Sequence, residues 1–239
     1  MNLLIYGIKG TMGRKIKELA VEDSFWTNVY GLDRQTPTPQ NEVEFNVLLD
    51  FTHESALDKV LNLAIDKNLP LVIGTTGYNG AQMEMIQRAS KRIPILHATN
   101  MSLGMNLLFA LVEKTAASLK DKVDIEVIES HHNRKKDAPS GSAVTIVKSI
   151  EKGLEEERKH QYGRQGECPR EKGEIGIHAI RGGNIVGYHE ANFINELESI
   201  KIAHEAYDRK VFAQGALEAA KFIIGKEPGL YSMKDVLKI

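Results

Sequence analysis

The sequence predicts an α/β protein in which a doubly wound parallel sheet is followed by a second, α+β domain with a mixed or antiparallel sheet. In the N-terminal part, short apolar segments alternate with segments of helical periodicity, a pattern typical of βαβ units. At residues 175–202, three alternating or apolar segments are separated only by short turns, which indicates antiparallel strands. Because the two patterns differ, we expect two domains.

The N-terminal domain opens with an apolar strand at residues 3–6, a glycine turn and a helix. Met12, Ile16 and Leu19 recur at helical spacing after the turn and form the apolar face of that helix. The alternation then continues through further strands and helices. Strands are expected at 28–32, 47–51, 69–73 and 94–98, and helices at 57–65 and 81–89.

The second domain begins with a long helix that Ser102 caps and that runs to Leu119. Ser140 is a second good cap, for a helix at 141–150. A segment rich in glycine and cations, 159–173, is expected to be an exposed, mobile loop. The remaining features are a strand at 123–129, turns at 182–184 and 195–196, and a closing helix at 212–223 that could return to the first domain.

Composition excludes several classes of function. With 42% hydrophobic and 26% charged residues, a chain of 239 residues can bury a substantial core. Its net charge of -1 gives no general attraction to nucleic acid or anionic membranes, so any anion site must be local. The single cysteine, Cys168, allows no intramolecular disulfide, and the apolar run at 3–6 is too short for a signal peptide or a membrane span. We therefore expect an unexported, cytoplasmic protein without a membrane partner.

The glycine turn indicates a dinucleotide site. Gly7, Gly10 and Gly13 lie between the first strand and its helix, where backbone N–H groups and the helix dipole can hold a pyrophosphate. The GxxGxxG spacing is less common than GxGxxG, so a tight turn without a ligand is the alternative. Asp33 ends the second strand and can bind ribose hydroxyls, which favours a Rossmann-like domain. Arg34 beside it could pair with a 2′-phosphate, so NADH and NADPH both stay open.

Other strand ends carry small polar residues, at 50–53, 74–77 and 98–101. Ligands of an open α/β sheet lie at the carboxyl ends of its strands, so these residues are expected to face the cofactor, with ordinary turn chemistry as the alternative. The candidate residues for binding NADH or NADPH are Gly7, Lys9, Gly10, Thr11, Met12, Asp33, Arg34, Gly74, Thr75, Thr76, Ala98, Thr99, Asn100 and Met101.

The most informative stretch is 129–142, which runs from a strand end into a helix N-terminus. His131, His132 and three cationic side chains gather before the helix cap, whose N–H groups also favour anions. The stretch lacks the aromatic residues of a nucleic-acid patch, and two consecutive histidines lack the spacing of metal ligands. A local anion site is therefore favoured, and a solvated basic loop is the plain alternative.

These motifs resemble the 4-hydroxy-tetrahydrodipicolinate reductase family, also called dihydrodipicolinate reductase. The resemblance rests on the loop from His131-His132 through Lys135 to Ser142 and extends over nearly the whole chain. Ser142 stands where the family usually has threonine, residues 133–134 occupy variable places, and the stretch after Arg34 is shorter than in many members. The other matching segments are the glycine turn with Met12, Asp50-Phe51-Thr52, Val72 to Gly77, Asn100 to Gly104 and Arg181 to His189.

The resemblance implies an NAD(P)H-dependent oxidoreductase of lysine and diaminopimelate biosynthesis that reduces 4-hydroxy-tetrahydrodipicolinate to tetrahydrodipicolinate. The nicotinamide would deliver a hydride, His131 would donate the proton as general acid, and Lys135 would stabilise developing negative charge. Roles for Arg181 and His189 are left open between catalysis and structure. Residues expected to hold the substrate carboxylates are His132, Lys135, Ser140, Gly141 and Ser142.

The resemblance also implies an organisation. Residues 1–101 and 209–239 would bind the dinucleotide, and 102–208 would bind substrate and form a homotetramer through their sheet, without metal, nucleic acid or membrane. One alternative is another dehydrogenase, such as a semialdehyde dehydrogenase with a catalytic thiolate, but Cys168 stands beside Pro169 without a recognisable base. A second is a non-catalytic NAD(P)-sensing protein, which would need no proton donor such as His131.

Overall fold

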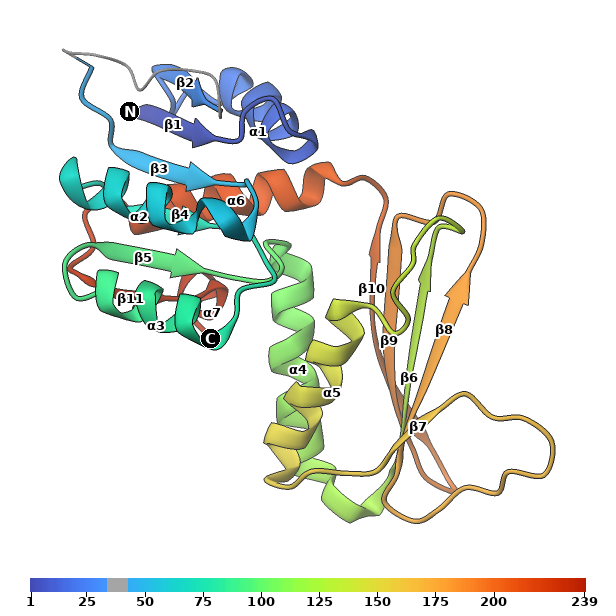
Figure 1. Ribbon diagram of the computed structural model, residues 1–239. Coiled ribbons are helices and arrows are strands. Elements are labelled where there is room, and N and C mark those ends of the chain that lie inside the picture. Colours follow the sequence, from blue (N-terminus) through green and yellow to red (C-terminus); the bar gives the residue numbers. More distant parts are fainter. Residues whose placement is uncertain (34–42) are drawn as a thin grey trace. The chain divides into compact units, whose positions relative to one another are not determined.

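The computed structural model describes residues 1–33 and 43–239, which form two compact units (Figure 1). The first unit contains Met1–Leu103 and Lys210–Ile239, and the second contains Gly104–Arg209. The chain therefore leaves the first unit once and returns to it with its closing helix. Arg34, a candidate cofactor residue, lies outside the described residues.

The first unit contains a parallel sheet of six strands in the order β11-β5-β4-β3-β1-β2, which confirms the predicted doubly wound sheet. The edge strand β11 was not predicted, because three residues are too short to show a period. The strands are β1 (Asn2–Tyr6), β2 (Asn28–Leu32), β3 (Val47–Asp50), β4 (Leu71–Ile73), β5 (Pro94–His97) and β11 (Gly229–Tyr231). The helices are α1 (Thr11–Glu22), α2 (Leu57–Asp66), α3 (Gly80–Ala89), α6 (Lys210–Ile223) and α7 (Met233–Leu237), with a 3-10 turn at Glu54–Ala56.

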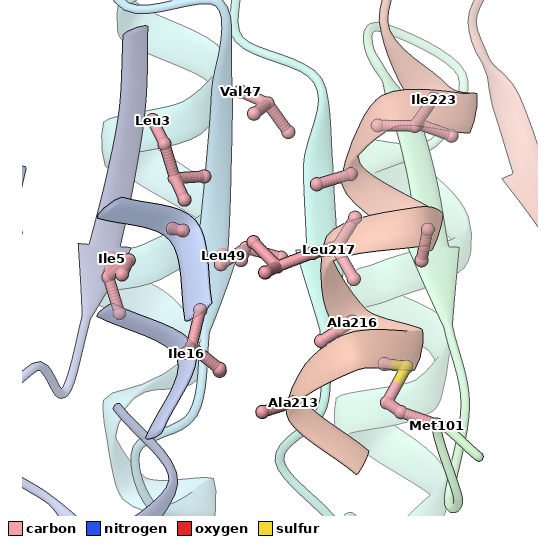
Figure 2. Close-up of a cluster of buried hydrophobic side chains, with 14 of the residues drawn as sticks. Leu3, Ile5, Ile16, Val47, Leu49, Met101, Ala213, Ala216, Leu217 and Ile223 are labelled. Atoms are coloured by element: carbon pink, nitrogen blue, oxygen red, sulfur yellow. The ribbon is translucent and has the colours of Figure 1, made fainter. Parts of the chain in front are cut away.

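Alternate residues of these strands enter two separate cores, because successive strand side chains point to opposite faces. Leu3 and Leu49 pack with α1, α6 and α7, as Figure 2 shows for α6. Leu4 and Leu48 pack with α2 and α3 on the other face. Each fully buried side chain of this size contributes roughly 1.5–3 kcal/mol, so the strand ends are held by a rigid sheet.

The second unit has a mixed sheet of five strands in the order β10-β9-β6-β8-β7, which confirms the predicted mixed or antiparallel sheet. Helices α4 and α5 lie along one face of this sheet and share a core with it (Figure 1). The strands are β6 (Asp124–His131), β7 (His160–Tyr162), β8 (Ile175–Arg181), β9 (Gly187–Ile194) and β10 (Ser199–Ala206). The helices are α4 (Leu103–Leu119) and α5 (Gly141–Leu154), with a 3-10 turn at Lys120–Lys122.

The connection between β8 and β9 differs from a simple hairpin. The two strands are not neighbours, because β6 lies between them, parallel to β8 and antiparallel to β9. The turn at 182–184 therefore crosses the end of β6. The Gly182 N–H donates to the His131 carbonyl at 2.9 Å, and the Asn133 N–H donates to the Gly183 carbonyl at 3.3 Å. These bonds hold the start of the basic loop, residues 131–140, against the turn at 182–184.

The segment 159–173 is more ordered in its contacts than the sequence suggested. Its first residues form β7, which pairs with β8. Arg164 and Arg170 form ion pairs with the carboxylates of Glu174 and Glu126. The segment is exposed or half-buried throughout, as expected for an exposed loop. The sequence did not reveal its ion pairs, because the pattern of cations does not show which carboxylates lie beside them.

Candidate active site

A cluster of polar side chains occupies the carboxyl end of β6 in the second unit. Glu129 and His131 are two positions apart, so they share the strand face that carries Val127 of the core. His189 of β9 stands opposite Glu129, and Arg181 of β8 stands opposite His131. Sheet register therefore brings together residues from three strands.

Glu129 is the centre of this cluster, and its side chain is completely buried. Its Oε2 lies 2.6 Å from Nδ1 of His131, and its Oε1 accepts the Ser140 N–H at 3.0 Å. Both terminal nitrogens of Arg181 donate to it, at 2.8 and 2.7 Å. Burial alone would raise the pKa of the carboxyl, but the bonds from His131, Arg181 and Ser140 outweigh burial and lower the pKa to about 2. Glu129 is therefore a buried anion at neutral pH.

Sequence reasoning did not single out Glu129. The available signal was its position two residues before a candidate catalytic histidine in a strand, which places both side chains on one face.

His131 is largely enclosed, with its Nδ1 committed to Glu129. Its other nitrogen, Nε2, lies beside Gly187, where an added Cβ would stand 3.3 Å from it. Glycine at 187 therefore leaves space next to Nε2. The ring of His189 packs edge-on against the His131 ring, with centroids 5.0 Å apart.

Ser140 connects the cluster to the N-terminus of α5. As predicted, it is the N-cap, and its Oγ accepts the Ala143 N–H at 3.2 Å. The same Oγ lies 3.0 Å from Nε2 of His189. Burial, followed by the charge of His131, lowers the pKa of His189 to about 4, so His189 is neutral at neutral pH. The first-turn N–H groups of α5 thus begin beside the polar cluster.

Two other candidate residues of the basic loop have partners outside the cluster. Lys135 Nζ lies 2.9 Å from Asp137 Oδ2, and this bond lowers the pKa of Asp137. His132 Nε2 lies 3.1 Å from the guanidinium of Arg209. Gly141 is exposed at the start of α5, and Ser142 follows it half-buried.

The glycine turn of the first unit is packed so tightly that two of its positions require glycine. Gly7 has φ +91°, and an added Cβ would stand 2.5 Å from the Phe51 carbonyl oxygen. A Cβ on Gly13 would overlap the Gly7 carbonyl. Gly10 is the N-cap of α1, so Thr11 and Met12 form the first turn of that helix. This close backbone approach before a helix N-terminus fits a pyrophosphate group.

Asp33 lies beside the same turn, because Lys9 Nζ is 2.6 Å from its Oδ2. The sequence placed only Arg34 next to Asp33, since pairing across a turn is not visible in a linear pattern. The acidic residue at the end of β2 is therefore already partnered by a cation of the glycine turn.

The ends of β3 and β4 meet as expected for parallel neighbours. The Thr52 N–H donates to Thr75 Oγ1 at 2.9 Å, and Thr52 Oγ1 donates to Asp50 at 2.6 Å. Burial raises the pKa of Asp50, which lies beneath these threonines. Gly74 packs on the Phe51 ring, while Thr76 is exposed.

Among the candidate cofactor residues that follow β5, Met101 has a buried side chain. Met101 is only 3% exposed and belongs to the core with α6 (Figure 2), so any contact with a cofactor would involve its backbone. Asn100 accepts the Ser102 N–H at 2.9 Å, and Ala98 and Thr99 precede it directly after β5.

Both parts of the chain match models of known protein families. Residues 1–101 match the model for dihydrodipicolinate reductase, N-terminus, and residues 104–237 match the model for dihydrodipicolinate reductase, C-terminus. The chain belongs to the dihydrodipicolinate reductase family. The resemblance drawn from the sequence is therefore confirmed.

Two relatives of this dihydrodipicolinate reductase family member are named 4-hydroxy-tetrahydrodipicolinate reductase. The protein of Alkaliphilus oremlandii (strain OhILAs) is 68% identical over 239 residues, with 100% of this chain and 99% of the relative covered. That of Alkaliphilus metalliredigens (strain QYMF) is 65% identical over 237 residues, with 99% of each covered. A dipicolinate-bound dihydrodipicolinate reductase from Paenisporosarcina sp. TG-14 shares the fold, with a TM-score of 0.77, 21% identity and 97% of each chain covered.

Residues 1–33 and 43–239 contain no helix that is long and apolar enough to span a membrane. The same residues hold no group of three or more histidine, cysteine, aspartate or glutamate side chains arranged for a metal ion.

Proposed function

We propose that this chain is a 4-hydroxy-tetrahydrodipicolinate reductase in which His131 donates the proton. The family membership and the 68% and 65% identical relatives support the reaction. The observation that carries the site is the Glu129-bound imidazole of His131 beside the N-terminus of α5. The enzyme is an NAD(P)H-dependent oxidoreductase of lysine and diaminopimelate biosynthesis.

The first unit binds the cofactor in this proposal. Gly7, Gly10 and the first turn of α1 would hold the pyrophosphate, because this tight turn places backbone N–H groups at a helix N-terminus. Asp33 and Lys9 hold the ribose end, together with Arg34. The reduced nicotinamide supplies the hydride when it is bound. The remaining contacts come from the strand ends, at Gly74, Thr75, Thr76 and residues 98–101.

The second unit binds the substrate. The positive end of α5 and the cation of Lys135 attract its two carboxylates, with His132, Ser140, Gly141 and Ser142 completing the site. Because Ser140 uses its N–H and hydroxyl within the protein, it acts by setting the start of α5. His131 then donates the proton on Nε2, and Lys135 offsets developing negative charge. One hydride and one proton enter and water leaves, since the product lacks the 4-hydroxyl group.

The second unit also forms the homotetramer in this proposal, through its sheet. The face opposite α4 and α5 carries Ile180 and Ile194, which are 51% and 37% exposed in the single chain. Burying such side chains favours association. Light scattering coupled to size exclusion should give four times the chain mass, and a monomer would contradict it. A cytoplasmic location fits the single, unpaired cysteine.

A direct assay tests the activity. Substrate is generated in situ from pyruvate and aspartate semialdehyde, and the absorbance of NADH or NADPH is followed. We expect the absorbance of NADH or NADPH to fall only when the enzyme, the cofactor and both precursors with their condensing enzyme are present. Binding of the cofactor without any oxidation would instead favour an NAD(P)-sensing protein.

A further inference from the structure

Glu129 is a fully buried carboxylate next to the proton donor, yet the mechanism above gives it no step. We propose that Glu129 is a positioning residue that holds His131 with its Nδ1 protonated and its Nε2 directed to the substrate, while Arg181 positions Glu129. This inference rests on the proposed function, since it concerns the same histidine.

The chemistry of the pair determines which nitrogen reacts. An ionised carboxylate can only accept hydrogen bonds, so the 2.6 Å contact requires that Nδ1 of His131 carries the hydrogen. The transferable proton is then the one on Nε2, beside the space at Gly187. When the Nε2–H bond breaks, the proton passes to the substrate and the neutral ring keeps its Nδ1–H bond to Glu129. No rotation of the imidazole is needed.

Glu129 is itself held in place from two further elements. Arg181 of β8 donates to both carboxylate oxygens, a two-pronged geometry that fixes the plane of the group. The Ser140 N–H donates to Oε1 and links the carboxylate to the cap of α5. The Glu129 carboxylate therefore fixes the position of both the proton donor, His131, and the end of α5 that binds the substrate carboxylates.

The other groups around His131 cannot take this role. His189 contacts the ring of His131 edge-on and uses its own Nε2 toward Ser140. Arg181 carries only donors, and Lys135 pairs with Asp137. Glu129 is thus the acceptor that faces Nδ1.

Nitrogen NMR of the wild-type enzyme with labelled histidine tests the tautomer without any variant. In the neutral imidazole, the signals of His131, assigned by comparison with His131→Ala, should show hydrogen on Nδ1 and none on Nε2. The opposite tautomer would overturn the proposal.

A double-mutant cycle tests whether Glu129 acts through His131. Glu129→Gln should lower kcat roughly 10- to 100-fold with the KM for NADH unchanged, and it should add nothing to the loss in His131→Ala. Independent, multiplying losses would show that Glu129 is only structural. Wild-type turnover in His131→Ala would instead contradict the proposed function, which separates the two failures.

Two further variants guard against misfolding. Arg181→Lys keeps the positive charge but loses the two-pronged bond, so kcat should fall less than in Glu129→Gln while the fold persists. Glu151→Gln removes another glutamate–histidine pair of the same unit, 2.8 Å from His160, and should leave kcat unchanged. Equal losses in Glu151→Gln and Glu129→Gln would overturn the proposal.

Discussion

Oε2 of Glu129 lies 2.6 Å from Nδ1 of His131, within one strand and on one face of its sheet. The contact follows from a two-residue spacing, because strand side chains alternate in direction. It leaves Nε2 of the histidine next to Gly187, while the other carboxylate oxygen of Glu129 accepts the N–H of Ser140, the N-cap of α5. Proton donation and carboxylate binding can thus be performed at one end of the second unit.

Lys135→Ala should lower kcat by about 10²–10⁴-fold, because the ammonium that offsets developing charge is lost. The Kd for NADH should stay the same, since Lys135 belongs to the second unit and the glycine turn to the first. Lys136→Ala is the matched control, because Lys136 is the neighbouring, exposed cation. Steady-state kinetics with circular dichroism check this, and equal kcat values for both variants would contradict the role of Lys135.

The Lys9–Asp33 pair should set cofactor preference. Asp33→Ala removes a negative charge near the ribose and should raise the ratio of kcat/KM for NADPH over NADH by about tenfold. Lys9→Ala leaves Asp33 without this cation and should lower the ratio, as should Arg34→Ala. We expect the wild type to use both cofactors. Shifts in the same direction for Asp33→Ala and Lys9→Ala would be incompatible with this account.

Acid should destabilise the protein through His189. Its folded pKa of about 4 is below the unfolded value of 6.5, so the unfolded chain takes up the proton first as pH falls. The free energy of unfolding should therefore decrease from pH 6.5 to about 4, by about 1.4 kcal/mol per pH unit from this group. Charges facing the ring come from His131, Glu129, His204 and Lys135.

Denaturant unfolding of His189→Gln tests this pH dependence. Glutamine can still accept a bond from Ser140 but does not titrate, so the slope of stability against pH should be shallower than in the wild type. Identical slopes in the two proteins would show that another group is responsible.

Gly7→Ala should destabilise the first unit by at least about 2 kcal/mol and abolish cofactor binding. The reason is its φ of +91° and the approach of the Phe51 carbonyl to 2.5 Å from an added Cβ. Gly80→Ala is the control, because nothing lies within 4 Å of its added Cβ. Thermal unfolding checks both variants, and an unchanged Tm for Gly7→Ala would contradict the strained turn.

Local patterns predicted the fold well where they were repeated. Five of the six strands of the first unit and the cap at Ser140 were predicted, because hydrophobic period and capping are properties of neighbouring residues. The order of the strands in the second sheet could not be predicted from the sequence. The turn at 182–184 suggested adjacent strands, but β6 lies between β8 and β9. The hydrophobic periodicity of a segment does not show which distant strand it pairs with.

In the candidate site too, the sequence revealed local motifs but not contacts between distant residues. The basic loop and glycine turn were visible as motifs, whereas the bonds from Arg181 to Glu129 and from Lys9 to Asp33 depend on tertiary contact. Met101 was expected at the cofactor because it follows a strand end; its apolar side chain is buried in the core, so that contact would involve its backbone.

The most direct measurement is a single turnover of a preformed enzyme–NADH complex mixed with freshly generated substrate. In the wild type, we expect oxidation of one equivalent of NADH per active site. The His131→Ala complex, with the same Kd for NADH, should react about 10²–10⁴-fold more slowly. Equal rates in the two proteins would contradict the assignment of His131 as the proton donor.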